Sequence, residues 1–167
     1  MNIIEKSESI RAGLRKGFQD GTSKMARRKC YGYDAGVDGK LVINPDEAAV
    51  VRWIFDHYLN GNSLGKIAAG LGAQGIPSPT GKPRWNREAI SKLISNEKYT
   101  GRVFLQKTIS AGGSQMKNDG LLARYLISDS HEAIISDEIF RAVQQEKVRR
   151  TNCPDKIIAT QEFSNRM

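Results

Sequence analysis

The sequence predicts an α+β fold, with an N-terminal projecting helix followed by a compact domain of three to four helices and a small antiparallel β-sheet. Apolar residues recur at helical spacing in several segments, and short apolar stretches flank glycine-containing turns. Two consecutive helical patterns between residues 63 and 95 indicate a helix-turn-helix-like core. The hydrophobic share of 39% is enough for one compact domain of this length.

The first predicted helix covers residues 2–19 and has only a narrow apolar stripe, formed by Ile3, Ile10, Leu14 and Phe18. Gly13 and Gly17 lie on one face, and each costs about 1 kcal/mol relative to alanine in a helix, but permits close approach of another backbone. We therefore expect this helix to lie against something outside its own domain; the alternative is a frayed chain end. The basic residues beside the glycines are Arg11, Arg15 and Lys16.

A basic arm is expected at residues 21–31, which show neither helical nor strand periodicity. Extended basic segments of this kind track phosphates or enter a minor groove, although a solvated linker has the same composition. The candidate DNA contacts in the arm are Lys24, Arg27, Arg28, Lys29 and Tyr31.

A hairpin is predicted from Tyr31 to Ile43, with its turn at Gly36–Gly39. The next helix begins after Asn44, with Pro45 at its first position and Glu47 expected to complete a capping box, and ends at Gly61.

The third helical pattern begins at the cap Ser63. The fourth begins at the cap Asn86 and extends to Ser95. Its apolar side contains Ala89, Ile90, Leu93 and Ile94, and Trp85 is placed to pack on Ile90. Its opposite side carries donors suited to base edges and phosphates, and two more precede it. The candidate DNA contacts of this segment are Lys82, Arg84, Arg87, Ser91 and Lys92.

After this segment we expect a strand at residues 102–107, a flexible loop at 108–120 and a returning strand at 121–127. A last helix is predicted from the cap Ser136 to Arg150, with Ile139, Phe140 and Val143 facing inward. Residues 151–167 have the composition of a linker.

The net charge of +8 is segregated along the chain. Residues 1–31 have eight Lys and Arg against three acids, and residues 81–107 have seven against two. Residues 32–80 have three against five, and the remainder is balanced at eight against eight. Two basic blocks separated by an acidic one indicate a polyanion contacted at two places, and nucleic acid is favoured over a membrane. The alternative is a chance asymmetry on a solvated surface.

The sequence also argues against several other classes of site and of protein. No phosphate loop, paired carboxylates or nucleophile with an adjacent base stands out, and no cofactor or metal is expected. Cys30 and Cys153 have no metal-ligand spacing and are expected to be free thiols in a reducing cytoplasm, while His57 and His131 are expected to be structural. No apolar run approaches the roughly 18 residues of a membrane span.

Three stretches resemble the recombinase domain of the large serine recombinases: KCYGYD, the run from Leu41 to Val103, and HEAIISDEIFRAVQQ. The resemblance covers roughly residues 30–147 and is most specific at Trp85–Gly101 and His131–Phe140. Residues 1–20 resemble the family's long helix, which mediates dimer contacts and crosses the minor groove. The final EFSNRM resembles the lead-in to its zinc ribbon.

The resemblance implies a linker helix at 1–20, the basic arm at 21–31, a DNA-binding domain at 32–150, and a linker toward a zinc ribbon at 151–167. It implies a parent enzyme that cuts and rejoins double-stranded DNA at attachment sites and self-associates through the N-terminal helix. The present chain, without the family's catalytic domain, is expected to bind DNA only. The arm would match the family's minor-groove linker, and the 86–95 helix would supply much of the attachment-site contact, together with neighbouring loops.

Two other interpretations are compatible with the residues alone. One is a winged-helix-like transcriptional regulator without a link to recombination, which would bury the N-terminal helix in its own domain or dimer. The other is a protein-interaction module whose basic faces meet acidic partners.

Overall fold

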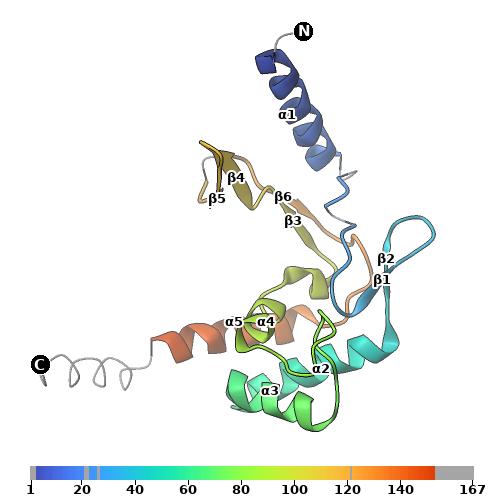
Figure 1. Ribbon diagram of the computed structural model, residues 1–167, viewed down its shortest axis with the longest axis vertical. Helices are drawn as coiled ribbons and strands as arrows, with labels where there is room; N and C mark the ends of the chain where they lie inside the picture. Colours follow the sequence, from blue (N-terminus) through green and yellow to red (C-terminus); the bar gives the residue numbers. More distant parts are fainter. Residues whose placement is uncertain (1–2, 21–22, 26, 121, 153–167) are drawn as a thin grey trace, which may run out of the picture. The chain divides into compact units, whose positions relative to one another are not determined.

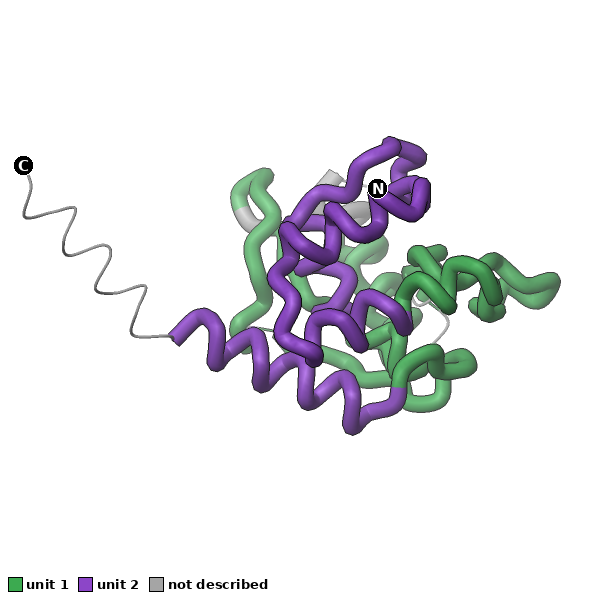
Figure 2. Tube along the Cα trace, turned by 90° about the horizontal axis from the view of Figure 1, so that it is seen from below, with its two compact units in different colours: residues 1–51, 97–135 green, residues 52–96, 136–167 purple. Residues whose placement is uncertain are grey.

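The computed structural model describes residues 3–20, 23–25, 27–120 and 122–152 (Figure 1). The predicted linker beyond residue 152, with Cys153, lies outside them. The chain divides into two compact units, and neither is contiguous in sequence (Figure 2). Unit 1 comprises residues 1–51 and 97–135, and unit 2 comprises residues 52–96 and 136–167.

Unit 1 contains the strands, and each strand pairs antiparallel with one partner. Its elements are α1 (Ile3–Gln19), β1 (Tyr33–Ala35), β2 (Leu41–Ile43), the 3-10 helix η1 (Glu97–Thr100), β3 (Val103–Leu105), β4 (Thr108–Ala111), β5 (Ser114–Lys117) and β6 (Tyr125–Ile127). The first seven residues of α2 (Pro45–Leu59) also belong to it.

The centre of unit 1 forms where η1 meets the segment 130–135. The Tyr99 carbonyl accepts hydrogen bonds from the amides of Ile134 and Ile135, each at 2.9 Å, and the buried Tyr33 hydroxyl donates to the Glu132 carbonyl at 2.7 Å. The rings of Tyr33 and Tyr99 stack with centroids 6.2 Å apart. This junction fixes residues that are far apart in sequence.

A second buried cluster of unit 1 contains Phe18, at the end of α1, with Val103 and Leu105 of β3. Tyr125 and Ile127 of β6 pack against it. By contrast, Ile10 and Leu14 of α1 are 58% and 51% exposed. Of the predicted stripe residues whose side chains the structure describes, Phe18 is therefore buried in unit 1, whereas Ile10 and Leu14 are not.

The flexible loop predicted for residues 108–120 is wrong, because this segment forms the β4–β5 hairpin (Figure 1). Gly112 and Gly113 have φ values of 58° and 81°, the left-handed pair that a two-residue hairpin turn requires. The side chains of β5 are all exposed, and Met116 is the one apolar residue among its four, so this strand lacks the alternating apolar pattern by which strands are recognised. The returning strand is present as β6, paired with β3.

Unit 2 is helical. It contains the rest of α2, then α3 (Leu64–Ala73), α4 (Arg87–Leu93) and α5 (Asp137–Thr151). The predicted caps are confirmed: the side chains of Ser63, Asn86 and Ser136 accept hydrogen bonds from the amides of Lys66, Glu88 and Ile139. The buried core residues of these helices include Ile54, Phe55, Ile67, Leu71, Ile90, Ile94 and Val143.

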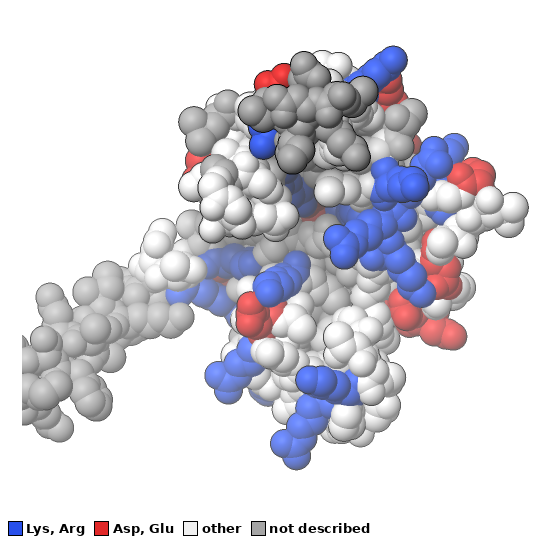
Figure 3. All heavy atoms as spheres, turned by 45° about the horizontal axis from the view of Figure 1, so that its top comes forward, with Lys and Arg blue, Asp and Glu red and all other residues white. Residues whose placement is uncertain are grey.

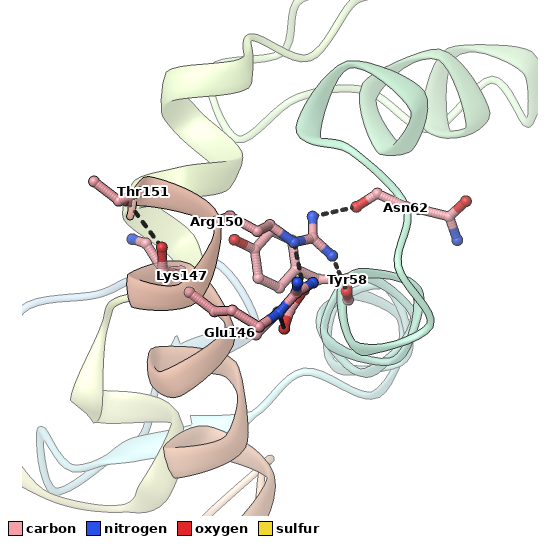
Figure 4. A network of polar contacts seen from close by, with 7 residues as sticks. Tyr58, Asn62, Glu146, Lys147, Arg150 and Thr151 are labelled. Atoms are coloured by element: carbon pink, nitrogen blue, oxygen red, sulfur yellow. Dashed lines mark hydrogen bonds and ion pairs between the residues drawn. The ribbon is translucent and has the colours of Figure 1, made fainter. Parts of the chain in front are cut away.

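Helix α5 is held to the end of α2 by Arg150 (Figure 4). Its guanidinium donates to the carbonyls of Tyr58 and Asn62, each at 2.8 Å, and lies 4.0 Å from the centre of the Tyr58 ring. Glu146 accepts from Arg149 and Arg150, and these hydrogen bonds lower the pKa of Glu146 to about 2. One arginine thus ties α5 to two carbonyls, that of Tyr58 in the last turn of α2 and that of Asn62 just after the helix.

Three details of the predicted helices are wrong. Helix α4 ends at Leu93 with Ile94 as its C-cap, so it is shorter than the predicted 86–95 segment. Ile139 is 41% exposed and Phe140 is partly buried, so Val143 alone of the three residues predicted to face inward is fully buried. Glu47 forms no capping box: its carboxylate accepts from the Gly32 amide at 2.8 Å, while the Asn44 amide donates to the Gly32 carbonyl.

The predicted α+β class is confirmed, with helices α2–α5 and small antiparallel sheets after α1. Among the described residues, no helix combines the length and apolar character needed to cross a bilayer.

Candidate nucleic-acid interface

The first candidate surface is built on α4 in unit 2. The α4 surface is defined here as Lys82, Arg84, Arg87, Ser91 and Lys92. Asn86 fixes the start of the helix by accepting from the Glu88 amide at 2.8 Å, and Ile90 and Leu93 are buried. Four members of the set are exposed, and Ser91 is partly buried. The structure therefore presents four cations of the set to solvent.

Arg87 lies across the first turn of α3. A methyl group added at Gly65 would meet the Arg87 Nε and Nη2 atoms at 3.0 Å. The absence of a side chain at Gly65 is therefore what admits this guanidinium, which remains exposed. Nothing in the local pattern of α3 indicates this contact.

The other α4 residues differ in how their polar groups are engaged. Lys92 forms an i,i+4 ion pair with Glu88 at 2.8 Å, and this pair lowers the pKa of Glu88. Lys147 of α5 donates to the Ser91 carbonyl and hydroxyl at 3.2 and 3.4 Å, and also contacts the Ser95 hydroxyl. Gln144 donates to the Ile94 carbonyl at 2.7 Å. Helix α5 therefore caps the C-terminal end of α4, and Ser91 is already engaged.

Lys82 and Arg84 lie in the loop that precedes α4. Buried Trp85 anchors this loop by donating its indole N–H to the Ile76 carbonyl at 3.1 Å. Ser78, also buried, accepts from the Lys82 amide at 3.1 Å and contacts the Thr80 hydroxyl. The loop thus has fixed internal contacts, which limit where its two cations can project.

The second candidate surface is the basic arm in unit 1. Its described residues form turns, with no helix or strand, and Lys24, Arg27, Arg28 and Lys29 are exposed. Two turn hydrogen bonds join the Arg27 amide to the Lys24 carbonyl and the Arg28 amide to the Met25 carbonyl. Tyr31 is partly buried, and its burial raises the pKa of its hydroxyl.

Two arm cations contact the β1–β2 hairpin. Lys29 pairs with Asp34 at 2.8 Å; this hydrogen bond raises the pKa of Lys29 and lowers that of Asp34, which also accepts from Asn44. Arg27 lies against Gly39, where an added methyl group would be 3.3 Å from Nη1. Lys29 therefore brings a partly compensated charge to any anion.

Arg11, Arg15 and Lys16 lie on the exposed part of α1, in the same unit as the arm. Figure 3 shows Lys and Arg side chains exposed at the surface that it presents. The structure thus places the predicted cations at the surface within each unit.

No group of three or more His, Cys, Asp or Glu among the described residues is suited to a metal ion. Burial raises the pKa of the Cys30 thiol to about 11, which opposes nucleophilic use. His57 stacks on Trp53 with centroids 3.7 Å apart, and His131 packs edge-on against Tyr33.

A family model described as Recombinase matches residues 45–150, which include α2, α3, α4 and α5 up to its penultimate residue. The chain belongs to the Recombinase family. This match confirms the resemblance to recombinases noted in the sequence, and it places the α4 surface inside the recombinase domain.

Two solved structures are similar to this recombinase domain. One comes from work on the sequence requirements of the Listeria innocua prophage attP site: it has 26% identity and a TM-score of 0.51, over 72% of this chain and 42% of that one. The other is a crystal structure of an LSR–DNA complex, with 26% identity and a TM-score of 0.49, over 72% of this chain and 32% of that one. The chain thus corresponds to less than half the length of either.

Proposed function

We propose that this recombinase domain is the sequence-specific DNA-binding part of a serine-type site-specific recombinase, and that it binds an attachment site. The observation that carries the proposal is the Recombinase match over residues 45–150. Similarity to a structure from work on the sequence requirements of a prophage attP site supports the same class of ligand.

Each unit supplies one basic surface for this role. In unit 2, the α4 surface presents Arg84 and Arg87, whose planar guanidinium groups suit bidentate contact with guanine or phosphate. In unit 1, Arg27 and Arg28 project from an arm without regular structure, a form suited to a minor groove or to phosphates. We assign the α4 surface to sequence discrimination and the arm to affinity.

The proposal is tested by titrating labelled duplexes with the chain and following fluorescence anisotropy at several salt concentrations. A cognate duplex can be selected from a randomised library, and a scrambled duplex of equal length serves as the non-cognate control. We expect binding to both, with log K falling linearly with log salt. No binding to any duplex at about 50 mM salt, where phosphate contacts are strong, would rule out the proposal.

Arg27→Ala combined with Arg28→Ala is expected to weaken binding to cognate and scrambled duplexes by the same factor, about tenfold or more. Since each phosphate contact contributes about 0.9 to the salt slope, the slope should become shallower by about 1.8. Both quantities come from the anisotropy titrations. A loss confined to the cognate duplex would contradict the assignment of the arm to affinity.

Arg87→Ala is expected instead to narrow the gap between cognate and scrambled duplexes by about 1–3 kcal/mol, the discrimination that one bidentate base contact provides. Arg141→Ala is the matched control, because Arg141 is an exposed arginine of α5 in the same unit. If the ratio of the two affinities stays constant in Arg87→Ala, α4 is not the reader of sequence.

The whole protein is proposed to catalyse strand exchange through a serine nucleophile carried outside this domain and to self-associate through α1. The exposure of Ile10 and Leu14 supports the second part, because these side chains find little apolar cover within unit 1. In the recombinase interpretation, α1 is available for contact with a partner protein. A transcriptional regulator would instead bury this helix in its own domain or dimer.

A further inference from the structure

Lys98 in η1 directs its ammonium group toward the backbone of the basic arm. The Lys98 Nζ atom donates to the Arg28 carbonyl at 2.8 Å and to the Met25 carbonyl at 3.3 Å. The side chain is partly buried, and burial lowers its pKa. A cation in the most basic part of unit 1 is thus engaged with carbonyl oxygens of the arm.

Tyr99, the next residue, holds the end of the same arm. Its hydroxyl donates to the Tyr31 carbonyl at 2.8 Å, while the Cys30 carbonyl accepts from the Tyr33 amide at 3.1 Å. Carbonyls at four arm positions therefore accept hydrogen bonds from residues outside the arm, two of them from Lys98. Because these acceptors are backbone atoms, the contacts fix the path of the arm without using its cationic side chains.

η1 is itself fixed, which makes it a suitable support. The Lys98 carbonyl contacts the Tyr33 hydroxyl and His131 Nε2, and the Tyr99 carbonyl accepts from Ile134 and Ile135. Tyr99 is buried in the centre of unit 1. The two residues that hold the arm therefore belong to a segment that is itself held by hydrogen bonds from other parts of the unit.

We propose that Lys98 is a positioning residue for DNA binding, which pre-organises the basic arm so that Arg27 and Arg28 meet the nucleic acid without first being ordered. This inference rests on the proposed function and adds a residue that does not touch DNA itself. Pre-organisation strengthens binding because the entropy of ordering the arm is lost on folding rather than on association.

The test is Lys98→Met, which keeps an unbranched side chain close in length to that of lysine and removes its donor and charge. Lys40→Met is the matched control, since Lys40 is an exposed lysine of the same unit and the substitution makes the same change in net charge. Limited trypsin digestion, read by mass spectrometry, reports cleavage after Lys24, Arg27 and Arg28. We expect about tenfold faster arm cleavage in Lys98→Met, corresponding to the loss of hydrogen bonds from a charged donor.

DNA binding by the same variants separates positioning from direct contact. Lys98→Met should lower affinity about tenfold at every salt concentration while leaving the slope of log K against log salt unchanged. Lys98→Arg retains a charged donor, so it should partly restore both the resistance of the arm to trypsin and the affinity for DNA. A slope shallower by about 0.9 with unchanged arm cleavage would make Lys98 a phosphate contact and overturn the inference.

Two further outcomes are decisive. Faster cleavage at all sites together with a lowered Tm would reduce Lys98 to a general stabilising residue and overturn the inference. If the unaltered chain binds no duplex, the proposed function fails; if it binds but Lys98→Met leaves arm cleavage unchanged, only the positioning role fails.

Discussion

Gly101→Ala is expected to destabilise unit 1 by about 3–4 kcal/mol. Gly101 has a φ of 81°, which costs an L-residue roughly 1–2 kcal/mol. The added methyl group would also lie 2.7 Å from the His131 carbonyl oxygen, a backbone atom that cannot move by a side-chain rotation. The Gly101 carbonyl accepts from the Ser130 amide at 2.9 Å, so relieving the clash would separate η1 from the segment that completes the unit.

The measurement is urea unfolding followed by tyrosine fluorescence and circular dichroism. Gly113→Ala is the control, because Gly113 has the same φ of 81° in the same unit but no atom within 4 Å of the added methyl group. This control should lose only the conformational cost, roughly 1–2 kcal/mol. Equal losses in the two variants would show that the contact with His131 is not a packing constraint.

Arg150→Ala should destabilise unit 2 by on the order of 3 kcal/mol. Hydrogen bonds from a charged donor contribute about 1.5–3 kcal/mol each, and the contact with the Tyr58 ring adds to them. The substitution leaves the Tyr58 and Asn62 carbonyls without this donor and removes one partner from Glu146 (Figure 4). The side chain of Arg150 is only 22% exposed, so water replaces these contacts poorly.

Arg149→Ala provides the comparison in urea unfolding, since Arg149 also pairs with Glu146 but is 70% exposed. Exposed ion pairs contribute about 0–1 kcal/mol, so the control should differ little from the unaltered chain. A small loss in Arg150→Ala, similar to that of the control, would mean that α5 stays on α2 through apolar packing alone.

The helices were predictable because their signals are local. Ser63, Asn86 and Ser136 each precede an apolar pattern, and each side chain accepts from an amide two or three residues ahead. The β4–β5 hairpin has no cap signal of this kind, and each of its strands has only four residues, with every side chain of β5 exposed, Met116 included. Composition alone therefore indicated a loop.

The candidate cations could also be predicted from the sequence, but their hydrogen-bond and ion-pair partners could not. Lys29 and Lys92 are both lysines of a basic segment, and the sequence does not distinguish their roles. Lys29 nevertheless pairs with Asp34 across a turn, whereas Lys92 pairs with Glu88 on its own helix. Ser91 is held by Lys147, 56 residues away, and the arm by Lys98, 70 residues from Arg28. Contacts at such separations exist only once the chain has folded, so a linear pattern cannot reveal them.

The interleaving of the two units has a consequence for how the chain acquires its structure during synthesis. Unit 1 is complete only when residues 97–135 are present, and unit 2 only when α5 has been added. Tyr33 bonds to Glu132 across 99 positions, and Arg150 bonds to Tyr58 across 92. Such non-local contacts slow folding, since distant parts of the chain must meet before either unit is stabilised. A ribosome that stalls anywhere before residue 135 therefore holds neither unit complete, and the contacts that the end of α2 makes with α5 form only when the last helix emerges.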